Sequence, residues 1–310
     1  MATIIDSHAH VLPDLIEKSL GSYSSVAATL KNRARSWLKP YYSYLHTAQT
    51  GLRHLPEAAR RPFDELGAIA PLFNLLLESN VSDLKKQMNE SGVTKAALIA
   101  HPPMISNEFI LKLAKADKSF LPVVNIPRNA PKPADKLREF IGMGAKCLKI
   151  HAASDGEDET SKHYLALLEA ASQSCLPVII HTGCMHSRLL YRDSRLGEAS
   201  RFEPWFKSFP KTKFILAHMN FHEPQKAIAI GESYLNVYVD TSWQPAEIIG
   251  EAAHRLGAER VLFGSDWPIV GNNLSIGLKR IRECVTAGAL TETQADLIMG
   301  KNAESVFAIE

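Results

Sequence analysis

Cysteine is scarce in this sequence, and the few cysteines are scattered. Cys147, Cys175, Cys184 and Cys284 show no CxxC spacing, so the chain gives no sign of a paired-cysteine metal or redox motif. Cysteines of this kind are most simply reduced thiols, as in a cytoplasmic protein. We therefore expect no disulfide framework and a cytoplasmic location.

Long apolar runs are also missing. No run reaches the ~20 residues that a helix needs to span a bilayer. The first residues, Met1–Ile5, lead straight into a strand-like run. They have neither the basic segment nor the long apolar segment of a signal peptide. We expect no membrane span and no signal peptide.

Charge of one sign does not accumulate anywhere in the chain. The formal net charge is +2 over 310 residues, without a large block of acid or base. This balance gives no support to a nucleic-acid or membrane-surface partner. With 45% hydrophobic and 22% charged residues, the composition suits a globular protein with a sizeable core. A single α/β barrel of ~250 residues plus insertions fits this length.

Short apolar runs, rich in β-branched residues, alternate with helix-length segments along the chain. This alternation is the signature of a (β/α)8 TIM barrel, and we expect one domain over residues 1–310. The predicted strands are Thr3–Ala9, Ala96–His101, Leu121–Ile126, Cys147–His151, Pro177–His181, Lys213–His218, Leu235–Asp240 and Arg260–Gly264.

One segment, Val11–Asn80, breaks the alternation because it is too long for a simple crossover. It is rich in aromatic residues and has helical stretches such as Ser25–Leu38. It leaves the end of the first strand, so it emerges at the catalytic face of a barrel. We interpret it as a helical insert that forms a lid or sets substrate specificity. A structural or dimer-forming role stays open, so a homo-oligomer is possible.

Metal-ligand residue types stand at the ends of the predicted strands. His8 and His10 lie two apart, so both side chains share one face of the first strand, and Asp6 has the same parity. An isolated HxH is a weak signal, but His181, His218 and Asp266 stand at strand ends too. Parallel barrel strands converge at their C-terminal ends, and imidazole and carboxylate are ligands that Zn²⁺ accepts. The pattern predicts a metal-dependent enzyme.

This pattern resembles the amidohydrolase superfamily. The segments His181–Gly183 and Phe263–Pro268, and the long insert, are similar to its amidohydrolase 2 branch. That branch includes aminocarboxymuconate-semialdehyde decarboxylase and many metal-dependent hydrolases. The resemblance covers nearly the whole chain, with Val11–Asn80 the least assignable part. It implies that a catalytic Zn²⁺ is held by His8, His10, His181 and Asp266. It also implies that His218 is a near-metal acid, base or electrophilic group.

The chemistry of these residues agrees with that division of labour. Bound Zn²⁺ lowers the pKa of its water to about 7 and polarises a carbonyl. Asp266 can both touch the metal and take the proton of the water. We therefore predict a zinc-dependent hydrolase that cleaves an amide, ester or lactone bond of a small molecule. The alternative is a non-oxidative decarboxylase of an aromatic or unsaturated carboxylic acid, which would use the same ligands.

The fourth predicted strand carries Lys149 and His151 on one face. In two-metal members of the superfamily, a carboxylated lysine on this strand bridges the ions. A lysine at its usual pKa is a cation and repels a metal, so only the carbamate can ligate. Contact with a substrate carboxylate is the second interpretation, and a plain structural role is the third. The sequence leaves all three open.

Several other residues near the strand ends are weaker candidates. His101 either lines the pocket or is a core histidine. Trp243 and Trp267 are candidates for the wall of a substrate pocket. We interpret three arginines mainly as residues of a solvated loop, with binding of a substrate carboxylate as the alternative. We interpret the remaining histidines as surface or structural residues. The arginines are Arg188, Arg192 and Arg195; the histidines are His46, His54, His163, His186, His222 and His254.

Overall fold

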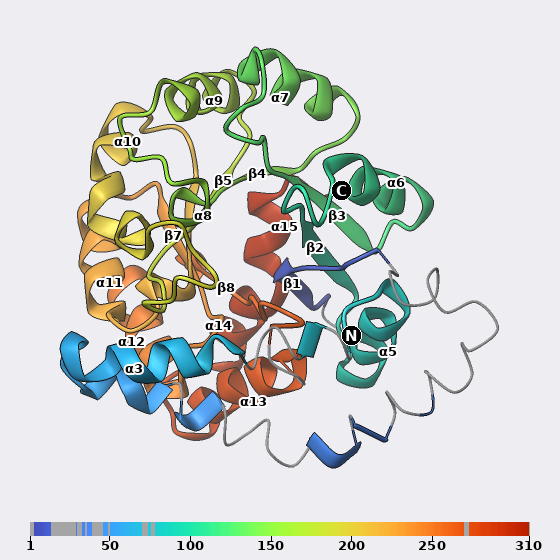
Figure 1. Ribbon diagram of the computed structural model, residues 1–310. Helices are drawn as coiled ribbons and strands as arrows, with labels where there is room; N and C mark the ends of the chain where they lie inside the picture. Colours follow the sequence, from blue (N-terminus) through green and yellow to red (C-terminus); the bar gives the residue numbers. More distant parts are fainter. Residues whose placement is uncertain are drawn as a thin grey trace.

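The computed structural model describes residues 3–13, 29, 33–34, 36–38, 46–48, 50–69, 74–75, 78–269 and 273–309. Eight parallel strands follow one another around a barrel in sequence order (Figure 1). They are β1 (Ile5–Ala9), β2 (Lys95–Ile99), β3 (Phe120–Val124), β4 (Cys147–Ile150), β5 (Val178–His181), β6 (Phe214–Ala217), β7 (Val237–Asp240) and β8 (Val261–Leu262). The TIM barrel and all eight predicted strands are confirmed.

Helices pack against the outside of the strands (Figure 1). The α-helices are α3 (Glu57–Gly67), α5 (Val81–Ser91), α6 (Asn107–Ala116), α7 (Pro133–Gly142), α8 (Ala152–Asp155), α9 (Lys162–Gln173), α10 (Glu203–Ser208), α11 (Pro224–Ser233), α12 (Ala246–Leu256), α13 (Asn273–Thr286), α14 (Glu292–Asp296) and α15 (Asn302–Val306). Short 3-10 helices are η2 (Leu52–His54), η3 (Ser194–Gly197), η4 (Ala199–Phe202), η5 (His218–Asn220) and η6 (Ala258–Arg260), and η7 (Leu297–Lys301) is a π-helix. None of the helices in these described ranges is long and apolar enough to cross a membrane.

The barrel closes where the first strand meets the last. The backbone N–H of Asp266 donates to the carbonyl of His8 at 2.8 Å, and that of His10 donates to the carbonyl of Trp267 at 2.7 Å. These bonds satisfy backbone groups that would otherwise be buried without partners. They also place the HxH pair directly beside the chain that carries Asp266.

The N-terminal mouth of the barrel is filled by the end of the chain. Phe307, just after α15, joins the interior layer of the barrel with Ile5 and Ile179. Lys213, which precedes β6, donates through Nζ to the Ser305 carbonyl at 3.2 Å. With one mouth filled, the C-terminal ends of the strands are left as the face on which a pocket can form.

Part of the predicted insert is described. Asp64 of helix α3 lies 3.2 Å from His222, just before α11, and Arg53 of η2 pairs with Glu247 of α12 at 2.6 Å. Of the helical stretch expected at Ser25–Leu38, residues 29, 33–34 and 36–38 are described, and they are helical. The remainder of that stretch falls outside the described residues, so its prediction stays untested.

Gly300 provides a test of the packing under β1. A Cβ at this position would lie 1.9 Å from the Thr3 carbonyl oxygen, so Gly300→Ala must displace the chain that enters β1. We expect it to lower the free energy of unfolding by about 1–3 kcal/mol. Gly142→Ala is the control, because no atom lies within 4 Å of its Cβ position. Equal urea-unfolding midpoints for the two variants would contradict this packing.

Candidate active site

Three of the predicted ligands converge at the seam between β1 and β8. The Asp266 Oδ1 atom lies 3.3 Å from His8 Nε2 and 3.5 Å from His10 Nε2. One ligand atom from each of the three residues lies within 4.8 Å of the others. Two imidazole nitrogens around a carboxylate oxygen form a donor set that suits a divalent metal.

His181 and His218 stand beside this group, at the ends of β5 and β6. The His218 Nε2 and His181 Nδ1 atoms are 3.2 Å apart, and the His8 and His218 ring centroids are 4.8 Å apart. Among the described residues, neither His8 Nε2 nor His181 Nε2 has a hydrogen-bond partner, although both atoms are buried. Buried polar atoms without partners are uncommon and need an explanation. A metal held by these nitrogens provides one, so the residues present fit such an ion.

Burial favours the neutral form of three imidazoles of the site, those of His218, His181 and His151. It lowers the pKa of His218 to about 3 and the pKa values of His181 and His151 well below the usual range. A metal binds the neutral imidazole, whose free nitrogen carries the lone pair. The electrostatics of the pocket therefore agree with the donor set.

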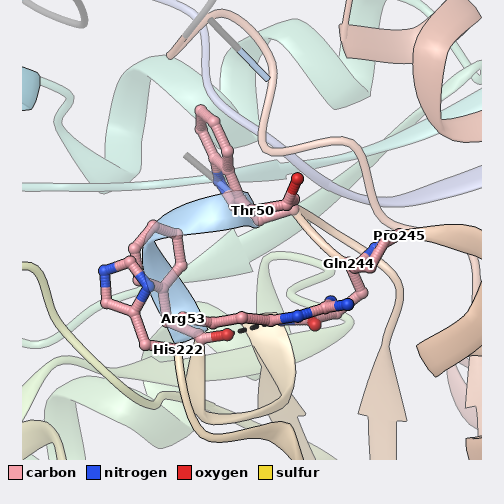
Figure 2. A pocket seen from close by; sticks show the side chains of 7 residues that line it. Thr50, Arg53, His222, Gln244 and Pro245 are labelled. Carbon is pink, nitrogen blue, oxygen red and sulfur yellow. Dashed lines mark hydrogen bonds between the residues drawn. The ribbon is translucent and has the colours of Figure 1, made fainter. Parts of the chain in front are cut away.

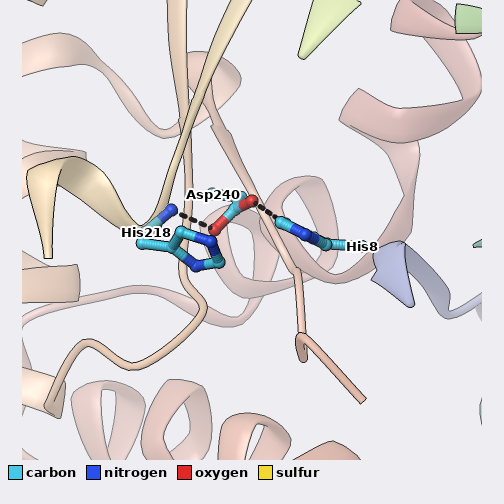
Figure 3. A group of neighbouring side chains, drawn as sticks. All are labelled: His8, His218 and Asp240. Carbon is cyan, nitrogen blue, oxygen red and sulfur yellow. Dashed lines mark hydrogen bonds and ion pairs between the residues drawn. The ribbon is translucent and has the colours of Figure 1, made fainter. Parts of the chain in front are cut away.

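Asp240, at the end of β7, is a functional candidate that our sequence reasoning missed. Its carboxylate faces both His8 and His218 (Figure 3). Asp240 Oδ2 lies 2.8 Å from His8 Nδ1, and Oδ1 accepts the backbone N–H of His218 at 3.0 Å. Burial raises the pKa of Asp240, but the contacts with His8 outweigh it and hold the pKa at about 2. The strand-end rule, applied to the predicted strand Leu235–Asp240, would have found it.

Three residues of the site have left-handed backbone conformations. The φ angles of His218, Trp243 and Asp266 are 64°, 66° and 57°. Non-glycine residues in this region carry strain, which surrounding contacts must hold. Gln244 Nε2 donates to the His218 carbonyl at 2.7 Å, and Trp243 Nε1 donates to Asp266 Oδ2 at 2.7 Å.

Two further residues hold the strand ends in place. A Cβ on Gly183 would lie 2.1 Å from the Asn220 carbonyl carbon, which requires glycine after His181–Thr182. Asp6 Oδ1 accepts the backbone N–H of Ser265 at 2.9 Å and that of His8 at 3.0 Å. Asp6 therefore ties β1 to the loop that carries Asp266, and it is a supporting group.

A cavity of about 250 Å³ opens beside the ligand set. Its polar lining includes Lys149 and His151, with His101 at the end of β2. Lys149 Nζ is buried and has no hydrogen-bond partner among the described residues. Burial lowers the pKa of Lys149 to about 8, against the attraction of Asp240 and Asp266. The structure thus brings the predicted Lys149 and His151 to the same cavity as the metal-ligand candidates.

Rings and apolar side chains make up much of the remaining wall. The His151 ring stacks on the His181 ring, with centroids 3.8 Å apart and planes at 13°. Tyr191, which sequence reasoning did not single out, lies 5.6 Å from His151 between ring centroids. Met104, Met185 and other apolar residues complete the lining.

The weaker candidates divide between wall and surface. Trp243 lines the cavity, whereas Trp267 is fully buried outside it. None of the three candidate arginines lines this cavity, and Arg195 instead pairs with Asp193 at 2.8 Å. His46 is buried, and its ring stacks on that of Trp243 with centroids 5.0 Å apart. Its assignment to the surface or structural group missed this contact with a residue of the site.

Figure 2 shows a second, smaller cavity, with Arg53, His222 and Gln244 among the residues around it. Thr50 and Arg53 from the predicted insert line it together with Gln244, and Phe221 and Trp243 line both cavities. The described part of the insert therefore reaches the residues that wall the site.

Helix α3 is held on the catalytic face by a buried carboxylate. Asp64 Oδ2 accepts the backbone N–H of His186 at 3.0 Å, and Oδ1 lies 3.2 Å from His222 Nε2. Gly67 and Leu75, which follow along the chain, line the main cavity. These contacts join the insert to the loops that leave β5 and β6.

We predict that Asp64→Ala loosens this attachment. Its loss leaves the donors of His186 and His222 without their buried acceptor, at a cost of about 1–3 kcal/mol. Hydrogen exchange followed by mass spectrometry should then show faster exchange in α3 and in residues 184–190. Asp135→Ala, which removes an exposed ion pair with Arg138 on α7, should leave both segments unchanged. Unaltered exchange in Asp64→Ala would count against the clamp.

Comparisons with known proteins bear on the family and the fold of this chain. A family model described as amidohydrolase matches residues 5–309. No curated protein matches the chain.

Several solved structures share the fold. The 5-carboxyvanillate decarboxylase of Sphingomonas paucimobilis is 16% identical, with 100% of both chains covered and a TM-score of 0.62. The same enzyme from Novosphingobium aromaticivorans, complexed with manganese and 4-hydroxy-3-methoxy-5-nitrobenzoic acid, is 15% identical, covering 99% of this chain and 96% of that one, with a TM-score of 0.62. A protein proposed to be a 2-pyrone-4,6-dicarboxylic acid hydrolase, from Pseudomonas putida, is 17% identical, covering 100% and 99%, with a TM-score of 0.60. At these identities the likeness shows the fold alone.

Proposed function

Because the chain belongs to the amidohydrolase family, and is an enzyme of that family, we propose that it is a metal-dependent hydrolase of a small molecule. The bond cleaved is an amide, ester or lactone. The observation that carries the proposal lies at the open end of the barrel. There, buried imidazole nitrogens that lack a hydrogen-bond partner among the described residues meet the Asp266 carboxylate.

We propose that His8, His10, His181 and Asp266 hold one divalent ion, with Zn²⁺ the first candidate. Imidazole and carboxylate donors suit zinc, and a catalytic zinc site leaves one position open. When bound, such an ion supplies Lewis acidity and lowers the pKa of water. A similar fold complexed with manganese supports the general idea of a divalent ion in this kind of barrel.

Asp266 is the proposed general base. Its Oδ1 faces the two histidines of β1, and its Oδ2 accepts one hydrogen bond from Trp243. A carboxylate oxygen has two acceptor sites, so Oδ2 keeps one for the proton of the attacking water. Asp266 can then pass this proton to the leaving atom. His218, which lines the same cavity, is the second catalytic candidate, as acid, base or electrophile.

The position of Lys149 is the reason for proposing that the substrate carries a carboxylate. Its buried Nζ faces the cavity and has no hydrogen-bond partner in the described part of the chain, and a buried ammonium is stabilised by an anion. His151 lies beside it on the wall. Similar folds are complexed with 2,6-dihydroxybenzoate and with a nitrobenzoic acid, which fits a small carboxylate. The insert, through Gly67 and Leu75, is proposed to set the shape of the pocket.

A decarboxylase is the second candidate, and the same lysine favours it. A carboxylate drawn toward Lys149 in a cavity walled by Met104 and Met185 would lose much of its hydration. Desolvation favours neutral CO₂ over a charged carboxylate. The C–CO₂ bond breaks with its electron pair left on carbon, and that carbon takes up one proton, for which the Lys149 ammonium is the candidate donor. A panel of esters, lactones, amides and aromatic carboxylic acids separates the two activities. Hydrolysis forms a new carboxylate without CO₂, whereas decarboxylation releases CO₂.

We predict that the purified protein binds about one divalent ion per chain and that His8→Ala loses it. The variant removes one donor from a group in which each ligand atom lies within 4.8 Å of the others. Elemental analysis after growth with added zinc measures the content. His254→Ala, at an exposed position of α12, should bind as the wild type does. The same metal content in His8→Ala and His254→Ala would remove the basis for this site.

We predict that Lys149→Met raises KM for a carboxylate substrate by about 10–100-fold, as expected for loss of a charged hydrogen bond of about 1.5–3 kcal/mol. Methionine keeps much of the apolar stem, so the wall is preserved. Metal content should stay at the wild-type value. Lys279→Met, an exposed substitution on α13, should alter neither quantity. Loss of metal in Lys149→Met would indicate a carbamate ligand and a two-metal site instead.

A further inference from the structure

Asp240 collects hydrogen bonds from several groups of the site. It is 1% exposed. Its Oδ1 accepts the backbone N–H groups of His218 and Ser242, both at 3.0 Å, and also the Ser242 hydroxyl. Its Oδ2 lies 2.8 Å from His8 Nδ1. An ionised carboxylate can only accept hydrogen bonds, so His8 must carry its proton on Nδ1.

The donor and acceptor of the Ser242–His218 and His218–His181 hydrogen bonds can also be assigned, starting from the Asp240 carboxylate. The Ser242 hydroxyl gives its single hydrogen to Asp240, so toward His218 Nδ1, at 2.7 Å, it can only accept. A neutral His218 protonated on Nδ1 has its lone pair on Nε2. That atom lies 3.2 Å from His181 Nδ1, so His181 must be the donor between them. His181 therefore also carries its proton on Nδ1.

We propose that Asp240 is a positioning residue that sets the tautomers of two histidines. It acts directly on His8, and on His181 through Ser242 and His218. Both rings then present the lone pair of Nε2, and these are the two imidazole nitrogens of the site that lack a partner among the described residues. The tautomer assignment stands on the hydrogen bonds, whereas its benefit to a metal rests on the proposed function.

The neighbouring residues support this arrangement. His10 is oriented separately, since its Nδ1 lies 3.3 Å from the Ile99 carbonyl, which can only accept. A Cβ on Gly264 would lie 3.1 Å from Asp240 Cγ and from His8 Cβ, so a larger residue at this position would crowd both side chains. The same directions make Nε2 of the resting His218 an acceptor, so this atom carries no proton that it could donate to a substrate.

Asp240→Asn is the sharpest substitution, because its amide can lie in only one orientation. Two backbone N–H groups donate to the Oδ1 position, so the amide oxygen must stay there. The amide NH₂ then replaces Oδ2 and donates to His8 Nδ1, which forces the proton of His8 onto Nε2. The Ser242 bond survives, so His181 keeps its tautomer. Ser242→Ala does the reverse: it breaks the branch to His218 and His181 and leaves His8 unchanged.

Imidazole ¹⁵N NMR of the full-length, metal-depleted protein at one fixed pH reads these tautomers. His163 gives an internal reference for the Nε2–H form, because its Nε2 lies 3.1 Å from the Ile126 carbonyl. We expect Nδ1–H signals for His8 and His181 in the wild type. Asp240→Asn should move only His8 to the reference form, and Ser242→Ala should shift only His218 and His181. An unchanged His8 in Asp240→Asn, or unchanged His218 and His181 in Ser242→Ala, would overturn the corresponding branch.

Zinc titration of the same proteins separates this proposal from the proposed function. Asp240→Asn should bind zinc about 10–100-fold more weakly than the wild type, the usual effect of losing such a partner. If the tautomers follow the substitutions but no protein binds zinc, the role of Asp240 stands and the metal site is wrong. If the wild type binds zinc and His8 keeps its tautomer in Asp240→Asn, the metal site stands and the role of Asp240 is wrong. Ser242→Ala preserves the test if Asp240→Asn does not fold.

Discussion

The hydrogen-bonded seam between β1 and the chain after β8 is the constraint on which the site depends. The bonds between Asp266 and His8, and between His10 and Trp267, close the barrel. The same bonds bring an HxH pair and a carboxylate, far apart in the sequence, to adjacent positions. Closure of the fold and assembly of the donor set are therefore one event, and a change that opened the seam would remove both.

Burial determines how the assembled residues behave. It disfavours the charged forms of His8, His181 and His218, which leaves nitrogens with lone pairs rather than cations. Burial also has a desolvation cost at three atoms of the site. These atoms, His8 Nε2, His181 Nε2 and Lys149 Nζ, are buried without hydrogen-bond partners among the described residues. Two nitrogen lone pairs suit a cation and the Lys149 ammonium suits an anion, and these are the features from which we propose a metal and a small acidic substrate.

Much of the fold and of the site could be predicted from the sequence. The predicted strands are short and apolar enough to be buried, and His8, His181, His218 and Asp266 stand at the ends of four of them. The ends of parallel strands converge in a barrel, so these residues could be expected to meet. Other features depend on contacts that no local pattern shows. Asp240 ends a predicted strand but resembles any strand-end acid until its donors are seen. The attachment of α3 through Asp64 and the stacking of His46 on Trp243 join segments that are far apart in the chain, with no periodicity to indicate them.

We propose that His8, His10, His181 and Asp266 hold one metal ion. X-ray absorption spectroscopy of the zinc-loaded protein tests this ligand set, because the first coordination shell reports donor type and distance. We expect nitrogen and oxygen donors at about 2.0–2.2 Å, with several imidazole rings in the outer scattering. Sulfur donors at about 2.3 Å, or a shell of oxygen alone without imidazole scattering, would contradict it.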